Sequence, residues 1–340
     1  MSKKKTTRRE VLGKLLVGGA AFSVLPCEEK VAVGETPPQA NSDQKSSDVD
    51  AISAPTRKDT NWAKFSDLKQ KIPTVKICGL EISRLTFGGG PWLGWSHDRD
   101  MAFVSNLLAV YHTKEKRFAT LKMAEACGIT AILVNPRGCP IVKEYWEKQS
   151  GAIQAITYCY GDTPEQLIER IEYSIKHEVS ACLIQGLAAD RLMKQGDTKT
   201  VLRCLDLIHK NDLPAGICAH NISTFKACIE KGIVPDFWMK TFHHHNYWSF
   251  APGLPEHDNV FCPDPEETIA FMQDRPEPWI AFKVLAGGAI SPRDGFRWAF
   301  ENGADVINVG MLDFEIVDDV NICTSILNSN LKRKRRWIEA

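Results

Sequence analysis

Short apolar runs alternate with segments of helical period from residue 75 onward. Each run has the length of a strand, and Thr163-Pro164 and Ser291-Pro292 are typical of helix starts. The runs occupy residues 82–89, 130–136, 153–160, 179–186, 213–220, 236–243, 279–288 and 305–311. Eight buried strands alternating with helices over about 250 residues favour a barrel over a doubly wound open sheet. The pattern predicts the α/β class, with a single (β/α)8 TIM barrel over residues 75–330.

The N-terminal part of the chain departs from this pattern. Residues 1–27 contain Arg8-Arg9 followed by an apolar stretch that Lys14 interrupts, so the segment resembles a twin-arginine export signal rather than a membrane span. Cys27 closes the stretch and is a candidate lipid anchor, with a plain signal peptide as the alternative. The polar residues of 28–74 predict a disordered tether. We therefore expect an exported, periplasmic or extracytoplasmic protein.

Composition restricts the partners more than it restricts the fold. The chain has 42 basic and 42 acidic residues, which gives no reason to expect a nucleic-acid partner. A basic run near the end predicts a solvated C-terminal tail over residues 331–340. The 11 cysteines include no C-x-x-C pair, so we expect neither a disulfide framework nor a zinc finger. The oligomeric state stays open, and a small molecule is the expected partner.

Polar or small residues end most of the predicted strands, and TIM-barrel active sites lie at the C-terminal ends of strands. The candidate catalytic residues chosen from these ends are Lys283, His220, Tyr158, Gln185 and Asn135. In the seventh run, alternation predicts that Ile280 and Phe282 face the helices. Ala281 and Lys283 would then face the lumen, since an unpaired lysine between sheet and helices is costly.

Five segments resemble, in order, the aldo/keto reductase superfamily. They are "VKICGLEISRLTFGGG", "AEACGITAILVNPRG", "LPAGICAHNISTFKACIEKG", "AFKVLAGGAISP" and "INVGMLDFEIVDDV". The resemblance implies an oxidoreductase barrel that seats a nicotinamide cofactor at its last two strands. It also implies an Asp, a Tyr, a Lys and a His as a proton relay. This tetrad is not kept, because Tyr158 stands near the place of the lysine and Gln185 near that of the histidine.

The residues expected to bind the cofactor also differ from the pattern of the family. Glycines and an amide that could admit a nucleotide are Gly89, Gly287, Gly288, Asn308 and Gly310. Four acidic residues follow the eighth run, at Asp313, Glu315, Asp318 and Asp319. A 2′-phosphate prefers cations, so NADP is disfavoured, and the cofactor stays open between an NAD-type nucleotide and a divalent metal.

Two other functions compete with a redox enzyme acting on a small carbonyl or sugar-type substrate. One is a divalent-metal hydrolase, lyase or isomerase acting on a sugar. Its ligands would be His220, His243 and His245, because alternation points His243 and His245 the same way. The other is a non-catalytic barrel that binds a glycan or a partner protein.

Overall fold

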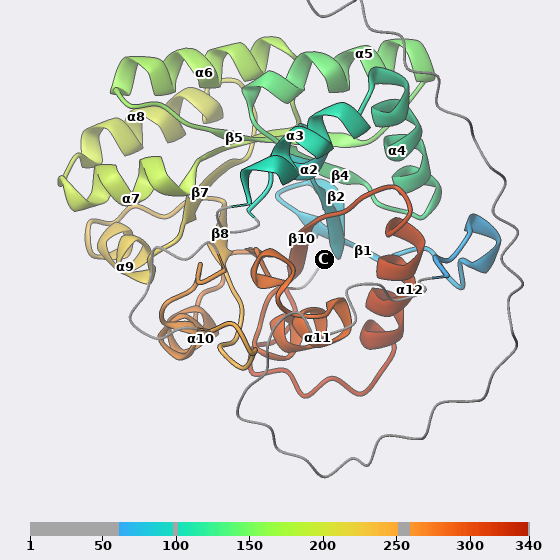
Figure 1. The fold of residues 1–340 in the computed structure, drawn as a ribbon. Helices are drawn as coiled ribbons and strands as arrows, with labels where there is room; N and C mark the ends of the chain where they lie inside the picture. Colours follow the sequence, from blue (N-terminus) through green and yellow to red (C-terminus); the bar gives the residue numbers. More distant parts are fainter. Residues whose placement is uncertain (1–60, 98–100, 251–258, 339–340) are drawn as a thin grey trace, which may run out of the picture. The chain divides into compact units, whose positions relative to one another are not determined.

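The computed structural model describes residues 61–97, 101–250 and 259–338, and Thr60–Ala340 form one compact unit. Its main sheet is a closed parallel barrel in the order β10-β3-β4-β5-β6-β7-β8-β9 (Figure 1). The strands are β3 (Leu85–Gly88), β4 (Ala131–Val134), β5 (Gln154–Cys159), β6 (Ala181–Ile184), β7 (Ala215–Ala219), β8 (Phe237–Thr241), β9 (Trp279–Phe282) and β10 (Val306–Gly310). Each lies inside one predicted apolar run, so the predicted (β/α)8 barrel is confirmed.

Helices surround the strands (Figure 1). They are α2 (Gly89–Trp92), α3 (Ala102–Tyr111), α4 (Lys114–Ala126), α5 (Cys139–Gln149), α6 (Pro164–Lys176), α7 (Gly186–Lys194), α8 (Thr198–His209), α9 (Ile222–Glu230), α10 (Pro265–Gln273), α11 (Pro292–Glu301) and α12 (Ile316–Leu327). Three short 3₁₀ turns are η2 (Phe65–Asp67), η3 (Pro136–Gly138) and η4 (Ala286–Gly288). In the described part of the chain, no helix combines the length and apolar character that crossing a bilayer requires.

Two apolar layers hold the barrel together, and they correct the predicted orientation of the seventh barrel strand. Ile280 packs in the lumen with Met239 and Val306, whereas Ala281 belongs to the layer between strands and helices. The prediction for this strand was therefore wrong by one residue. The strand ends at Phe282, and Lys283 has a left-handed backbone with φ 56°, so the alternation does not continue through the lysine.

An antiparallel hairpin closes the N-terminal end of the barrel. It consists of β1 (Thr74–Ile77) and β2 (Leu80–Ser83), and its side chains Val75, Ile77 and Ile82 join the lumen core. The first predicted run, 82–89, thus combines the end of this hairpin with β3. The hairpin agrees with the resemblance of "VKICGLEISRLTFGGG" to an opening hairpin and first strand.

The segment before the hairpin is packed, which corrects the predicted extent of the tether. The amide of Ala63 donates to Asp318 (2.9 Å), the amide of Lys69 donates to Asn321 (2.9 Å), and Ile72 is buried in the core. Residues 61–73 are therefore part of the barrel unit, because α12 satisfies their backbone groups. The predicted signal at 1–27 and the tether as far as residue 60 lie outside the described residues.

The basic C-terminal run is also packed, so the predicted solvated tail is wrong for residues 331–338. The Arg335 guanidinium donates to the fully buried Asp305 (2.5 Å), and Arg333 lies 3.7 Å from the same carboxylate. Trp337 lies between two guanidinium groups, 3.9 Å from Arg84 and 3.3 Å from Arg333. Asp305 immediately precedes β10, so these contacts cover the N-terminal end of the barrel and leave the opposite end for function.

Candidate functional site at the C-terminal end of the barrel

A histidine and a carboxylate are paired where β7 ends. His220 follows directly after β7, and its Nδ1 lies 3.2 Å from Oδ2 of Asp190 on α7. The same carboxylate accepts hydrogen bonds from the His220 amide (3.0 Å) and the Thr224 hydroxyl (2.6 Å). Asp190 is thus fixed by the start of α9, and it fixes the imidazole in turn.

The pair sets the protonation state of the imidazole. A carboxylate can only accept, so the ring proton resides on Nδ1 and Nε2 carries the lone pair. Burial lowers the pKa of His220 from its usual range, Asp190 opposes this shift, and the nearby Lys283 and Lys240 add to it. Within the described residues Nε2 has no hydrogen-bond partner. Neutral His220 therefore offers a general base at the barrel mouth.

A glycine makes room for this imidazole. A Cβ atom on Gly186, the first residue of α7, would lie 2.6 Å from Cε1 and 2.7 Å from Nδ1 of His220. Distances this short do not occur between real side chains, so any other residue would displace the ring. Gly186 is therefore a positioning residue for His220.

We expect Gly186→Ala to shift the His220 ring away from Asp190 and weaken the Nδ1 hydrogen bond. Loss of the carboxylate contact lowers the pKa of His220 further, because Asp190 raises it. Histidine-ring NMR resonances followed across pH measure both effects. Gly90→Ala is the control, since its added Cβ would meet only the Trp95 carbonyl oxygen at 4.0 Å. Unchanged His220 resonances in Gly186→Ala would contradict the assigned role.

Lys283 reaches the mouth through its left-handed backbone rather than through alternation. Its Nζ lies 3.8 Å from the ring centroid of Phe261, and the His97 ring centroid is 5.5 Å from that of Phe261. Loss of hydration from surrounding protein atoms lowers the pKa of His97 to about 4, with smaller effects from Lys283 and His220, although His97 itself is exposed at the surface. Lys283, His97 and His220 therefore surround one region of the mouth.

Three other predicted catalytic residues have different surroundings. Tyr158 on β5 packs toward the lumen, and burial raises the pKa of its phenol to about 12. Gln185 precedes α7, and among the described residues neither its carboxamide nor the Tyr158 hydroxyl has a hydrogen-bond partner. Asn135 is buried and its Oδ1 accepts from the Arg137 amide (3.0 Å). Tyr158 and Gln185 can thus contact a ligand, whereas Asn135 shapes the turn after β4.

The three histidines proposed as metal ligands are not brought together. His243 is fully buried, its Nδ1 donates to the His244 carbonyl (2.9 Å), and its Nε2 accepts from the amides of Phe261 (3.0 Å) and Cys262 (3.1 Å). The Nε2 of His245 donates to the Cys262 carbonyl (2.7 Å). In the described ranges no group of three His, Cys, Asp or Glu could hold a metal ion. The imidazole nitrogens of His243 and His245 form hydrogen bonds with the backbone of residues 261–262. These bonds attach that loop to the end of β8.

Two of the predicted cofactor glycines are used in packing. A Cβ on Gly89 would lie 2.6 Å from the Leu133 carbonyl oxygen, and one on Gly310 would lie 2.7 Å from Cδ of Pro91. These glycines let α2 approach β4 and β10 closely, so they are not open to a phosphate. Gly287 has φ 66° and a Cβ there would lie 2.8 Å from the His97 carbonyl oxygen. A Cβ on Gly288, which has φ 91°, would meet no described atom within 4 Å, so Gly288 is the open member of the set.

The residues after β10 do not suit a 2′-phosphate. Asp313 is paired with Lys116 (2.7 Å) and Tyr111 (2.5 Å), and Glu315 accepts from the Leu312 amide (2.7 Å). Asp319 is buried, its carboxylate has no hydrogen-bond partner among the described residues, and burial together with Glu315 and Asp318 raises its pKa to about 8. A 2′-phosphate placed here would lie near the carboxylates of Asp313, Glu315 and Asp318, which disfavours it although Lys116 neutralises Asp313.

Asp319 makes a pH-dependent contribution to stability. Because its folded pKa lies above the unfolded value, the native state binds the extra proton between about pH 4 and pH 8, and stability falls as pH rises through that range. We expect Asp319→Asn to remove this fall. Its gain in free energy of unfolding should be near zero at pH 4 and about 5 kcal/mol at pH 8, since the folded and unfolded pKa values differ by about four units.

Urea unfolding at both pH values measures the difference, with the exposed Asp206→Asn on α8 as the control. An equal effect of Asp319→Asn at pH 4 and pH 8 would show that Asp319 is ionised throughout.

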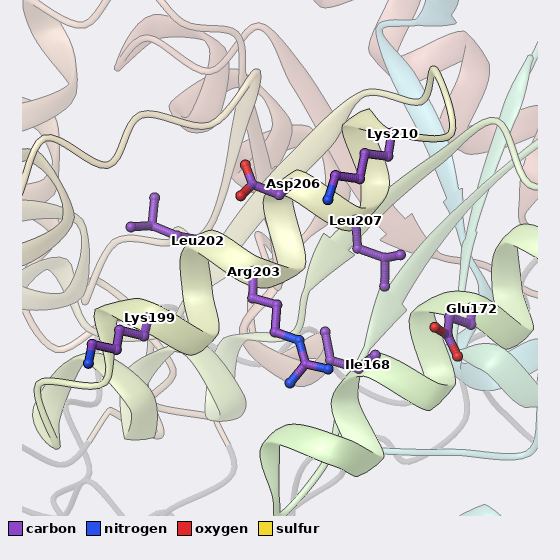
Figure 2. Close-up of a pocket in the computed structure, with 8 residues that line it drawn as sticks. All are labelled: Ile168, Glu172, Lys199, Leu202, Arg203, Asp206, Leu207 and Lys210. Atoms are coloured by element: carbon purple, nitrogen blue, oxygen red, sulfur yellow. The ribbon is translucent and has the colours of Figure 1, made fainter.

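A surface depression lies elsewhere on the barrel unit. It has a volume of about 410 Å³ and lies between α6 and α8 on the outer layer of the barrel (Figure 2). Charged side chains of both signs line it, among them Glu172, Arg203 and Asp206. It contains none of the strand-end residues, so it is separate from the candidate site.

Sequence patterns missed three parts of the site. Asp190 lies within an ordinary amphipathic helix, and His97 lies in a loop with no strand-end signal. Gly186 directly follows Gln185 at the end of the fourth barrel strand. That position was the one sequence signal that could have indicated its role. All three owe their roles to tertiary contacts with His220 or Lys283.

Comparison with known proteins bears on the fold. No protein-family model and no curated protein sequence matches the chain. A Pseudomonas aeruginosa structure described as a candidate aldo-keto reductase superimposes with a TM-score of 0.56 at 15% identity, covering 77% of this chain and 98% of that one. A second structure with the same description and source gives 0.56 at 16% identity, covering 77% and 99%. At this identity the likeness shows a shared barrel fold.

Proposed function

We propose that the chain is an exported oxidoreductase that interconverts a small carbonyl compound, or a sugar with a free carbonyl, and the corresponding alcohol. The observation that carries the proposal is the Asp190–His220 pair at the C-terminal end of the barrel, next to Lys283. The similarity of fold to structures described as candidate aldo-keto reductases supports it, although the relay residues of that family are replaced.

The side chains divide the proton chemistry between them. In the direction of alcohol oxidation, Nε2 of His220 takes the hydroxyl proton while Asp190 stabilises the imidazolium that forms. The Lys283 ammonium stabilises the negative charge that develops on the substrate oxygen. Tyr158, with a pKa of about 12, stays protonated and donates a hydrogen bond to the same oxygen. In the reverse direction, the imidazolium returns the proton.

The residues of the mouth fit an NAD-type nucleotide better than NADP. The Gln185 carboxamide and the Asn308 side chain are suited to the nicotinamide amide, since among the described residues the single partner of the two side chains is the Thr86 hydroxyl, which donates to Oδ1 of Asn308 (3.1 Å). The open turn at Gly288 and Arg293 at the start of α11 are suited to a pyrophosphate. The acidic residues after β10 disfavour a 2′-phosphate. When bound, this nucleotide supplies hydride transfer.

Export rests on the N-terminal sequence alone. Arg8-Arg9 and the apolar stretch after them suit a route that carries folded proteins. Every cysteine in the described ranges is a free thiol, as suits a protein that folds in a reducing compartment before export. Cell fractionation of Arg8→Lys with Arg9→Lys tests this part, and unchanged export would overturn it.

Nucleotide binding and turnover test the catalytic part. NADH and NADPH fluorescence titrations should show at least tenfold tighter binding of NADH. Turnover is then assayed with NADH and a panel of aldehydes, ketones and free sugars. Absence of nucleotide binding and of turnover would overturn the redox function. Retained sugar binding in that case would favour the non-catalytic glycan-binding barrel.

A further inference from the structure

Helix α3 presents an apolar face to solvent. Phe103, Leu107 and Val110 are 64%, 60% and 77% exposed, and Met101 before the helix is 47% exposed. The spacing of i, i+4 and i+7 places the three helical residues in one stripe. Residues 101–112 contain no Asp, Glu, Lys or Arg, although such residues make up 25% of the chain. A continuous uncharged stripe of large exposed side chains marks an interaction surface.

The opposite side of α3 packs against the residues that follow α2. Leu108 is buried, the Ser105 hydroxyl accepts from the Ser96 amide (3.2 Å), and a Cβ on Gly94 would lie 3.1 Å from Ala109. The helices α2 and α3 are inserted between β3 and α4, on the side of the C-terminal strand ends (Figure 1). The stripe is therefore a fixed feature beside the candidate site.

The N-terminal segment enters the described structure against α12, and the residues just before α12 also contact the end of α3. The Trp62 ring centroid is 4.8 Å from that of Phe314, and Phe314 follows Asp313, which accepts from the hydroxyl of Tyr111 at the end of α3. Before Asn61, the sequence leads through residues 28–60 back to Cys27 and the apolar stretch that ends at Leu25. Residues 28–60 span at most about 110 Å when fully extended. Any membrane attachment near Cys27 thus places a lipid surface within reach of α3.

We propose that the apolar face of α3, formed by Met101, Phe103, Leu107 and Val110, docks on a lipid surface. The stripe offers aliphatic and aromatic side chains without charge, which matches the boundary between headgroups and acyl chains. The lack of charge in residues 101–112, together with the apolar stretch that precedes Cys27 on the same chain, favours lipid over a second copy of the chain. Attachment at the N-terminus raises the effective concentration of lipid at the face, so a weak contact suffices. Docking there holds the barrel mouth close to the membrane.

Flotation with phosphatidylcholine vesicles tests the docking face. The full chain is compared with a variant carrying Phe103→Ser, Leu107→Ser and Val110→Ser. Both contain the same N-terminus, so the difference in vesicle partitioning reports on α3. We expect the partition coefficient to fall at least tenfold, and Leu107→Ser alone to give a smaller fall. Because the stripe is uncharged, raising the salt concentration should change wild-type binding less than twofold.

Leu202→Ser is the matched control, since Leu202 on α8 is exposed and apolar but lies outside the stripe. It should float like the wild type. Equal flotation of the triple variant and the wild type would overturn the proposal. A wild-type dimer in sedimentation analysis that the triple variant dissociates, with flotation unchanged, would also overturn it and assign the face to a second copy. Circular dichroism confirms that the exposed substitutions leave the barrel folded.

Discussion

Asp305→Ala is expected to lower the free energy of unfolding by about 3–5 kcal/mol, because it leaves buried positive charge without its partner. Asp305 has no exposed surface, and its carboxylate contacts the guanidinium groups of Arg335 and Arg333. It also accepts from the amides of Trp279 (3.0 Å) and Ile338 (3.2 Å). Removing it therefore releases the C-terminal segment from the strands that it covers.

Urea unfolding followed by circular dichroism measures this loss. A double-mutant cycle with Arg335→Met separates the ion pair from the other contacts of each side chain. If the pair is coupled as the distances indicate, Asp305→Ala costs much less in the Arg335→Met background than in the wild type. The exposed Asp206→Ala serves as the control. A loss below about 1 kcal/mol for Asp305→Ala would show that the C-terminal segment is not held by this carboxylate.

His220→Asn is expected to lower kcat/KM by about 10²–10⁴-fold, the range that a general base contributes. Asparagine keeps a polar side chain at the mouth but cannot take a proton. Asp190→Asn should also reduce activity, since an amide cannot stabilise the imidazolium as a carboxylate does. These variants should keep their affinity for NADH, because neither residue belongs to the proposed nucleotide-contacting set.

The pH profile distinguishes a base from a merely structural histidine. Burial lowers the pKa of His220, so the acid limb of kcat/KM should lie below the usual histidine range. Asp190 raises that pKa, so Asp190→Asn should move the limb to still lower pH. His209→Asn is a matched control, because His209 forms an exposed pair with Asp236 (2.8 Å) on the barrel surface. Activity of His220→Asn within threefold of the wild type would remove His220 from the mechanism.

The site could be predicted only in part. Strand-end residues are read directly from apolar runs, which gave His220, Lys283, Tyr158 and Gln185. The partner of His220 could not be found in this way, because Asp190 lies in the helix of the preceding βα unit. The prediction from the histidine triplet 243–245 failed because it relied on residue type without knowledge of the tertiary contacts. Its residue types suggested metal binding, but hydrogen bonds to the backbone of residues 261–262 occupy His243 and His245.

The amino-acid sequence by itself determined the barrel, because eight apolar runs of strand length separated by amphipathic helices can bury their surfaces in few other ways. It also determined where along each strand the chemistry could lie. Tertiary structure alone decided the rest, namely the packing of residues 61–73, the burial of Arg335 on Asp305 and the pairing of His220 with Asp190. Each depends on polar groups that are far apart in the chain, and burying these groups is favourable only when they contact each other. A local sequence pattern does not contain this information.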